Sequence, residues 1–436
     1  MILRFFIAMV WVLLVACAPS QKLSKYQVAS HLEKLDKRLR CFSGMVVYDP
    51  QADKYLIEKN ADRYFTPASN TKLFTFYAGW KMLGDSLPAL KYAEQGDSLI
   101  FWGTGNPTLL HKKLPDSLAL QFLCSQKGKK VFYADIPMRD QRLGPGWAWD
   151  DYPYYFSTEK ASFPIYGNNV WIHLNGTQHK PVVEPHYFET LLDSGYDAKG
   201  EYLTIRRAEH HNRFVYQPEL DVMQSEESLP FRYDTNLMLR LLKDTLHFPI
   251  SSYQEKELPP AKILRSLPAD SLYKHMLQPS DNFYAEQIML MCSAMLGDTL
   301  DSKKAIGYVT ENFLGDLSAP PIWEDGSGLS RYNLFTPRSI VDLLRKIHKE
   351  VPQERLFDML PAGGRNGTLK YWYDSNEPFV FAKTGTLRNN HCLSGYLLTR
   401  KGKVLIFSMM FNHYTVPTTN VKKEMEKILW GLRMRY

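Results

Sequence analysis

The chain has 436 residues, enough for about two or three domains. Its apolar content of 44% and charged content of 23% indicate a globular protein with a sizeable core. The net charge of +7 is modest, and the absence of a dense run of lysine and arginine excludes nucleic acid as an expected partner.

The N-terminal segment differs from the rest of the chain. Arg4 is followed by an apolar run too short to span a bilayer of ~30 Å, which is typical of a secretory signal. The string LVAC, which ends at Cys17, resembles the bacterial lipobox, in which cleavage before the cysteine precedes lipidation. We expect residues 1–17 to be a lipoprotein signal peptide and 18–30 a tether; an ordinary signal peptide is the alternative. The mature protein is then exported, on the periplasmic side, and anchored in the membrane.

Four cysteines remain after this processing: Cys41, Cys124, Cys292 and Cys392. Export permits disulfides, but the four are widely spaced and three lie in apolar surroundings, so buried free thiols are expected. The sequence has no CxxC motif and no cluster of cysteine and histidine. We therefore expect no metal and no other cofactor.

The next segment alternates strand and helix. Residues 41–60 have the pattern of a β-hairpin, with SGMVVYD and YLIEKN on either side of a turn. Ser69 suits the start of a helix, whose apolar residues recur at helical spacing from Leu73 to Trp80. We assign residues 31–95 to the first part of a domain that the C-terminal segment completes.

Helical periodicity fades over residues 96–255. This segment is rich in aromatic residues and turn signals, with short alternating stretches such as VWIHL. We expect a β-rich domain inserted into the first one.

Residues 256–436 return to the pattern of the first segment. Apolar helices are predicted over 282–295 and 337–348, three strands over 378–413, and a helix over 421–434. The outer segments thus predict one α/β (α+β) domain built from both ends of the chain, with an antiparallel sheet covered by helices.

The first candidate catalytic motif of this domain is a Ser-x-x-Lys string. Ser69 and Lys72 stand at i and i+3, so a helix places both side chains on one face. The serine hydroxyl needs a base, and lysine can serve when burial or nearby cations lower its pKa. The free N–H groups at the start of the helix can also stabilise an oxyanion.

The same spacing occurs twice more, at Ser157 and Ser271. Ser271 precedes Ser280 by only nine residues, which leaves no room for the intervening structure. Ser157 lies in the inserted segment without a strand–turn–helix setting. Ser69 alone has that setting.

Two further strings follow in order, Ser280-Asp-Asn282 and Lys383-Thr-Gly385. Ser280 could equally cap the following helix, and both roles are compatible. Lys383 offers a positive charge to a substrate carboxylate, and Gly385 would let a substrate backbone approach the strand edge. The three strings together indicate a serine acyl-transferase that works without a catalytic histidine.

These strings and three others carry a family resemblance. The sequence resembles penicillin-recognising serine enzymes and is similar to the D-alanyl-D-alanine carboxypeptidase/endopeptidase family that includes penicillin-binding protein 4. Residues 103–109 resemble that family's GDPTL segment, with Asn106 in place of aspartate. DGSGLSR at 325–331 and LPAGGRNGTL at 360–369 match family patterns, and the long insertion before Ser280 matches its layout. The resemblance implies a β-lactamase/DD-peptidase-like fold, with residues 31–95 and 256–436 as the two parts of a transpeptidase-like domain.

The resemblance also implies the site. The catalytic residues would be Ser69, Lys72, Ser280, Asn282 and Lys383. The substrate-binding residues would be Thr384, Gly385 and Thr386.

Each of these residues takes a role from the family. Ser69 would be the acylated nucleophile and Lys72 its general base. Ser280 would relay a proton to the leaving amine, and Asn282 would hold the substrate amide. The backbone N–H groups of Ser69 and Thr386 would form the oxyanion hole. Lys383 and Thr384 would bind the terminal carboxylate. We expect Ser327 and Arg331 to have a structural role, because they lie in a glycine-rich turn.

The activity so implied is hydrolysis of the D-Ala-D-Ala bond of peptidoglycan stem peptides, and of cross-links as well, with β-lactams such as penicillin as covalent inhibitors. A serine β-lactamase is an alternative, but Glu209-His-His-Asn212 precedes Ser280, the wrong order for a class A enzyme. A catalytically weak wall-binding homologue is a second alternative, but the intact Ser69 and Lys72 argue against it. An α/β-hydrolase would need a Gly-x-Ser-x-Gly string.

Overall fold

The computed structural model describes residues 25–175, 181–195, 205–216, 224–255 and 257–436. The expected signal peptide, with Cys17, lies outside the described residues, and so does most of the expected tether. Helix α2 (Lys25–Leu39) begins inside the range 18–30 assigned to that tether. No helix within the described ranges is long and apolar enough to cross a membrane.

A five-stranded antiparallel sheet joins the two ends of the chain. Its order is β14 (Val380–Leu387), β15 (Asn390–Leu398), β16 (Val404–Asn412), β1 (Phe42–Asp49) and β2 (Lys54–Lys59). Phe42 pairs with Asn412, so β1 lies between its hairpin partner and a strand from the far end of the sequence. The predicted hairpin and the three predicted C-terminal strands are thereby confirmed.

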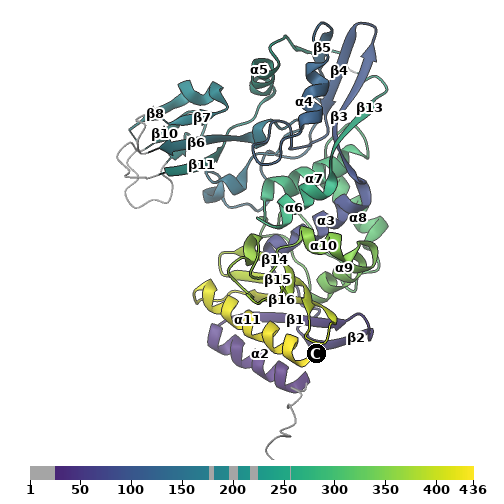
Figure 1. Ribbon diagram of the computed structural model, residues 1–436, viewed down its shortest axis with the longest axis vertical. Helices are drawn as coiled ribbons and strands as arrows, with labels where there is room; N and C mark the ends of the chain where they lie inside the picture. Colours follow the sequence, from purple (N-terminus) through teal and green to yellow (C-terminus); the bar gives the residue numbers. More distant parts are fainter. Residues whose placement is uncertain (1–24, 176–180, 196–204, 217–223, 256) are drawn as a thin grey trace, which may run out of the picture.

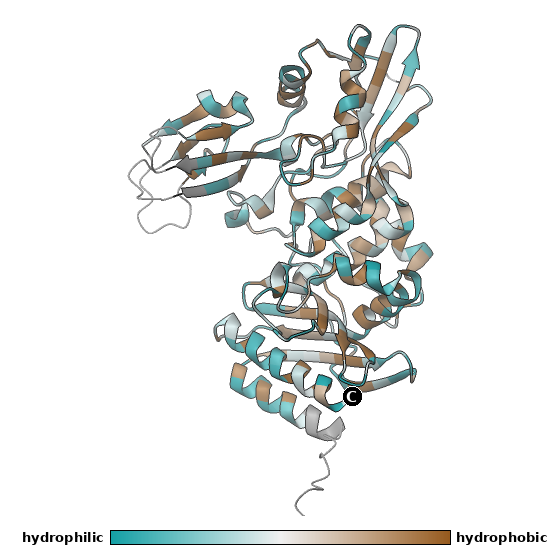
Figure 2. Ribbon diagram, in the orientation of Figure 1, coloured by the Kyte–Doolittle hydropathy of each residue, from teal (hydrophilic) through white to brown (hydrophobic). Residues whose placement is uncertain are grey.

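Alternate residues of β1 enter two different cores. Met45 and Val47 pack in one cluster, while Val46 and Tyr48 pack in another on the opposite face. Because both faces of the strand are buried, helices must cover the sheet on each side. Figure 2 shows hydrophobic residues concentrated in these strands and hydrophilic residues along α2 and α11.

Two layers of helices cover the sheet (Figure 1). One layer consists of α2 and α11 (Thr418–Arg435). The other consists of α3 (Thr71–Met82), α6 (Ala269–Leu277), α7 (Asn282–Ala294), α8 (Ser302–Phe313), α9 (Pro337–Glu350) and α10 (Gln353–Met359). The helices predicted after Ser69 and over 282–295, 337–348 and 421–434 are confirmed within a few residues at their ends.

The inserted segment has its own five-stranded sheet. The order is β12 (Ser251–Ser252), β5 (Lys130–Tyr133), β4 (Ser98–Gly103), β3 (Ser86–Gln95) and β13 (Lys262–Pro268). The edge strand β13 and its neighbour β3 lie beyond the range 96–255 expected for the insertion. The reason is long-range pairing, since Leu264 of β13 is in register with Leu90 of β3.

Within its described residues the insertion also contains two small sheets and two α-helices (Figure 1). One sheet contains β11 (Gln224–Pro230), β6 (Asn169–Asn175) and β7 (Val182–Glu184). The other contains β8 (Leu192–Ser194), β10 (Phe214–Tyr216) and β9 (Ile205–Arg207). The helices are α4 (Ser117–Cys124) and α5 (Thr235–Leu246), which the fading periodicity had not predicted.

The four described cysteines are free. Cys41, Cys292 and Cys392 are buried, as expected for thiols in apolar surroundings, whereas Cys124 is exposed at the end of α4.

Candidate active site

Ser69 lies in a tight 3-10 turn, η1 (Ala68–Asn70), that leads directly into α3. Ala68 has a φ of 48°, in the left-handed region that non-glycine residues rarely adopt. Its carbonyl accepts a hydrogen bond from Thr71 Oγ1 at 2.9 Å. A Cβ added to Gly328 would lie 1.9 Å from the same carbonyl oxygen, so only glycine fits there. This packing holds the predicted nucleophile at the N-terminus of the helix.

Lys72 is fully buried one turn later and makes three contacts. Its Nζ lies 3.0 Å from Ser69 Oγ, 2.6 Å from Asn282 Oδ1 and 2.7 Å from the carbonyl oxygen of Ser327. The amide of Asn282 is oriented by its Nδ2, which donates to the carbonyl oxygen of Phe156 at 2.9 Å. Lys72 therefore faces two groups that can only accept and one hydroxyl that can also donate.

This arrangement suits a neutral amine. A neutral lysine has two N–H bonds and one lone pair, and the oxygens of Asn282 and Ser327 take both N–H bonds. The lone pair is then left for the hydroxyl proton of Ser69. Burial lowers the pKa of Lys72 to about 8, although the carboxyls of Asp325, Asp281 and Glu286 oppose the shift.

The second string brings Ser280 to the same space. Ser280 has a φ of 67°, and its Oγ accepts a hydrogen bond from Lys383 Nζ at 2.8 Å. The interpretation of Ser280 as a helix cap is wrong, since Asp281 is the N-cap of α7 and accepts from the N–H of Tyr284 at 3.0 Å. A serine whose hydroxyl does not cap the helix is free to face the cleft.

The third string lies on β14. Lys383 is buried and donates to Ser280 Oγ and to the carbonyl oxygen of Thr384. Burial, together with the nearby charge of Lys72, holds the pKa of Lys383 well below its usual range. Thr384 Oγ1 donates to Thr368 Oγ1 at 2.7 Å, and the exposed Thr386 has its Oγ1 2.8 Å from His391 Nδ1.

The structure shows a packing constraint at Gly385 that the sequence did not predict. A Cβ at this position would lie 2.5 Å from the carbonyl oxygen of Pro67, 2.9 Å from the nitrogen of Ser69 and 3.0 Å from that of Asn70. The nucleophile's own turn therefore packs closely against Gly385, and the approach of a substrate backbone to the same strand stays a prediction. Asn70 ties the same two segments together, since its Nδ2 donates to the carbonyl oxygen of Lys383 at 2.8 Å.

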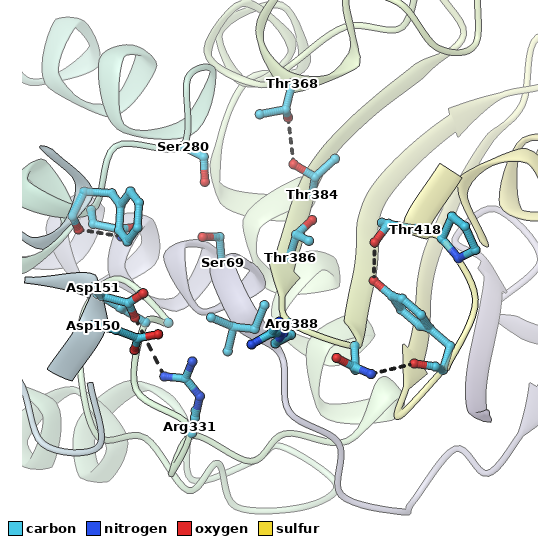
Figure 3. Close-up of a pocket in the computed structure, with 18 of the residues that line it drawn as sticks. Ser69, Asp150, Asp151, Ser280, Arg331, Thr368, Thr384, Thr386, Arg388 and Thr418 are labelled. Atoms are coloured by element: carbon cyan, nitrogen blue, oxygen red, sulfur yellow. Dashed lines mark hydrogen bonds and ion pairs between the residues drawn. The ribbon is translucent and has the colours of Figure 1, made fainter. Parts of the chain in front are cut away.

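A cleft of about 700 Å³ opens over these groups. The side chains of Ser69, Ser280, Thr384 and Thr386 face a common space in Figure 3. Asp150, Asp151 and Arg331 lie across Ser69 from Thr384, and Arg331 Nη1 lies 3.8 Å from Asp151 Oδ2. The other lining residues include Tyr155, Phe156, Asn282, Thr368, Arg388, Asn389, Tyr414 and Thr418.

The other two Ser-x-x-Lys strings do not form a serine–lysine pair. Lys160, three residues after Ser157, contacts Asp140 at 2.5 Å. Lys274, three residues after Ser271, contacts Asp358 at 2.8 Å. The Glu209–Asn212 string lies next to the small outer sheet, between β9 and β10, and does not line the cleft.

Two buried carboxylates under the site were not predicted. Asp325 accepts from the N–H groups of Gly328 and Ser330 at 2.8 and 2.7 Å, and from Trp147 Nε1 at 2.9 Å. Glu286 accepts from the N–H of Ser327 at 2.8 Å. The spacing of Glu286 four residues after Asn282, on the same face of a helix, could have pointed to it.

The fold and the serine–lysine pair together define a serine peptidase of the penicillin-recognising class. The family model of the D-Ala-D-Ala carboxypeptidase 3 (S13) family matches residues 24–226 and 243–431. The chain belongs to this family. The predicted family, fold class and kind of enzyme are thereby confirmed.

Individual relatives agree with this assignment. The chain is 24% identical over 421 residues to the D-alanyl-D-alanine carboxypeptidase DacB of Haemophilus influenzae, covering 85% of each protein. It is 26% identical over 425 residues to the D-alanyl-D-alanine carboxypeptidase of an Actinomadura species, covering 86% of this chain and 78% of that one.

A solved structure shares the whole architecture. Penicillin-binding protein 4 of Haemophilus influenzae has a TM-score of 0.73 at 19% identity, covering 92% of this chain and 99% of that chain. A predatory peptidoglycan endopeptidase of Bdellovibrio bacteriovorus has a TM-score of 0.51 at 12% identity, covering 90% and 93%. Peptidoglycan lies outside the cytoplasmic membrane, so the expected export agrees with the family.

Proposed function

We propose that this enzyme hydrolyses the terminal D-alanyl-D-alanine bond of peptidoglycan stem peptides through an acyl-enzyme on Ser69. The observation that carries the proposal is the buried Lys72 Nζ, 3.0 Å from Ser69 Oγ, with both of its N–H bonds taken by other acceptors. The names of the curated relatives support the choice of substrate. Cross-linked stem peptides, which contain the same kind of bond, are a second substrate in this proposal.

Acylation begins with proton transfer. The amine of Lys72 takes the hydroxyl proton as Ser69 Oγ attacks the carbonyl carbon of the penultimate D-alanine. The N–H groups of Ser69 and Thr386 stabilise the oxyanion. Lys383 and Thr384 hold the terminal carboxylate, and Asn282 holds the substrate amide.

Collapse of this intermediate breaks the peptide bond. The C–N bond cleaves as Ser280 passes a proton to the departing nitrogen, and D-alanine leaves. This proton is the one that Lys72 took from Ser69, so the proton balance of acylation closes. Lys383 orients Ser280, because its Nζ donates a hydrogen bond to Ser280 Oγ. Water then attacks the ester on Ser69, releases the shortened stem peptide and restores the hydroxyl.

A labelled penicillin tests the acyl-enzyme directly, because its strained amide acylates the same serine. We expect one stable adduct, located on Ser69 by mass spectrometry and absent from Ser69→Ala. An adduct elsewhere, or full activity of Ser69→Ala, contradicts the mechanism. Rapid release of the opened penicillin would instead identify a β-lactamase. Products from purified muropeptides separate carboxypeptidase from endopeptidase cleavage.

We further propose that the protein is a lipoprotein, anchored through Cys17. The lipobox-like string supports this. Expression in bacteria should give a membrane-bound protein, and Cys17→Ala should release it. Membrane attachment of Cys17→Ala at the wild-type level would contradict the anchor.

A further inference from the structure

A buried carboxylate that the reaction above does not use lies beneath the serine–lysine pair. Glu286, on α7, has none of its surface exposed. Its Oε1 accepts from the N–H of Ser327 at 2.8 Å, while its Oε2 accepts no hydrogen bond. Burying a carboxylate is costly unless its charge and its lone pairs are matched, so the neighbours of Glu286 explain its place.

Ser327 joins Glu286 to Lys72. The amide of Ser327 donates to Glu286, and the carbonyl of the same residue accepts from Lys72 Nζ at 2.7 Å. The preceding residue is also held, because the carbonyl oxygen of Gly326 accepts from Thr75 Oγ1 on α3 at 2.5 Å. Glu286 therefore fixes the residue whose carbonyl takes one of the two N–H bonds of the neutral amine.

The inserted segment provides the cation that faces Glu286. Lys160 Nζ lies 3.9 Å from Glu286 Oε2 and 2.5 Å from Asp140 Oδ2, and the side chain of Lys160 is 3% exposed. Burial lowers the pKa of Lys160, but the carboxylates of Glu286 and Asp140 outweigh it and raise the pKa overall. Lys160 thus stays charged and offsets the two carboxylates.

We propose that Glu286 is a positioning residue for the Ser69–Lys72 pair, and that Lys160, from the inserted segment, completes it. The carboxylate holds Ser327 in place by its hydrogen bond, and its negative charge favours the protonated form of Lys72. The proposal rests on the proposed function, because it requires Lys72 to be the general base. It makes the insertion part of the catalytic apparatus.

Several other charged groups face Lys72. Asp281 caps α7, the helix that carries Glu286, while Asp325 lies in the glycine-rich turn and Lys383 lies on β14. Among these neighbours, Glu286 is the one whose side chain binds the amide of Ser327. Burial, and next the charge of Asp325, raise the pKa of Glu286, so its charge is sensitive to the loss of Lys160.

The test measures the rate of acylation by labelled penicillin against pH in the full-length enzyme. Glu286→Ala removes the hydrogen bond to Ser327, and we expect the rate at high pH to fall about 100-fold through misplacement of Lys72. Glu286→Gln keeps an oxygen acceptor but removes the charge. The acylation rate of Glu286→Gln at high pH should stay within about threefold of the wild-type rate. The acid limb of its pH–rate profile, where the rate rises as Lys72 loses its proton, should move down by about one pH unit. Glu324→Gln, next to the same turn, is the matched control. It should leave the acylation rate at high pH and the position of the acid limb unchanged.

Lys160→Met tests the second half of the proposal. It leaves Glu286 buried without its cation, so acylation should slow by about 10-fold or more, and adding Glu286→Gln should restore part of the rate. Wild-type rates in Glu286→Ala, an unmoved acid limb in Glu286→Gln, or no restoration in the double variant would each overturn the inference. If the wild-type protein is not acylated on Ser69, the proposed function itself fails.

Discussion

Gly385→Ala tests whether the close packing of β14 against the nucleophile's turn sets the position of Ser69. The added Cβ would lie 2.5 Å from the carbonyl oxygen of Pro67, about 0.9 Å short of an ordinary 3.4 Å contact. The next nearest atoms are the backbone nitrogens of Ser69 and Asn70, so no side chain can rotate to make room.

The turn or the strand must therefore move by several tenths of an ångström. Overpacking of this kind costs about 1–3 kcal/mol of stability. A displacement of the nucleophile by about 1 Å slows acylation by about 100-fold. The assays are the acylation rate with a fluorescent penicillin and the thermal unfolding midpoint.

Gly431→Ala is the matched control. Gly431 lies in α11, and a methyl group added there would meet no neighbouring atom within 4 Å. Alanine at this position should therefore stabilise the helix by about 0.5–1 kcal/mol without changing the acylation rate. Wild-type acylation and an unchanged midpoint in Gly385→Ala would refute the packing argument.

Four further outcomes follow from the site. Lys72→Met should slow acylation by about 10²–10⁴-fold, the usual contribution of a general base, as measured by penicillin labelling. In the wild type the same rate should rise with pH up to about 8 and then level, because burial lowers the pKa of Lys72 to that value and only the neutral amine accepts a proton. Ser157→Ala should label at the wild-type rate, since Lys160 is engaged by Asp140. Trp147→Phe removes a 2.9 Å hydrogen bond to Asp325 and should cost about 1–3 kcal/mol in urea unfolding.

The parts of the site that could be predicted from sequence are those encoded by short spacing. Ser69 and Lys72 are one helical turn apart, so their contact follows from local geometry alone. The same holds for the amphipathic α9, where Thr336 caps a helix that begins at Pro337. Such features depend on a few neighbouring residues and leave a readable pattern.

The parts that could not be predicted depend on distant pairing. The role of Gly385 depends on the turn at Pro67, more than 300 residues earlier, and nothing near Gly385 in the sequence reveals it. Likewise β3 and β13 join the sheet of the insertion through pairs such as Leu90 with Leu264. The helix α5 did carry a signal, an Asp234 cap, but it is short and lies among β-like stretches.

The position of β1 has a consequence for the time at which activity arises. Phe42 pairs with Asn412, so β1 has no neighbour on that side until β16 has been made. The strands that contact the nucleophile's turn, β14 and β15, also come from the C-terminal part of the chain. Asn412 Oδ1 also accepts a hydrogen bond from the N–H of Thr66, just ahead of the nucleophile's turn, at 2.8 Å. A partly synthesised chain that still lacks β14, β15 and β16 therefore carries Ser69 without a working site. The enzyme can act on peptidoglycan only once these C-terminal strands have joined β1.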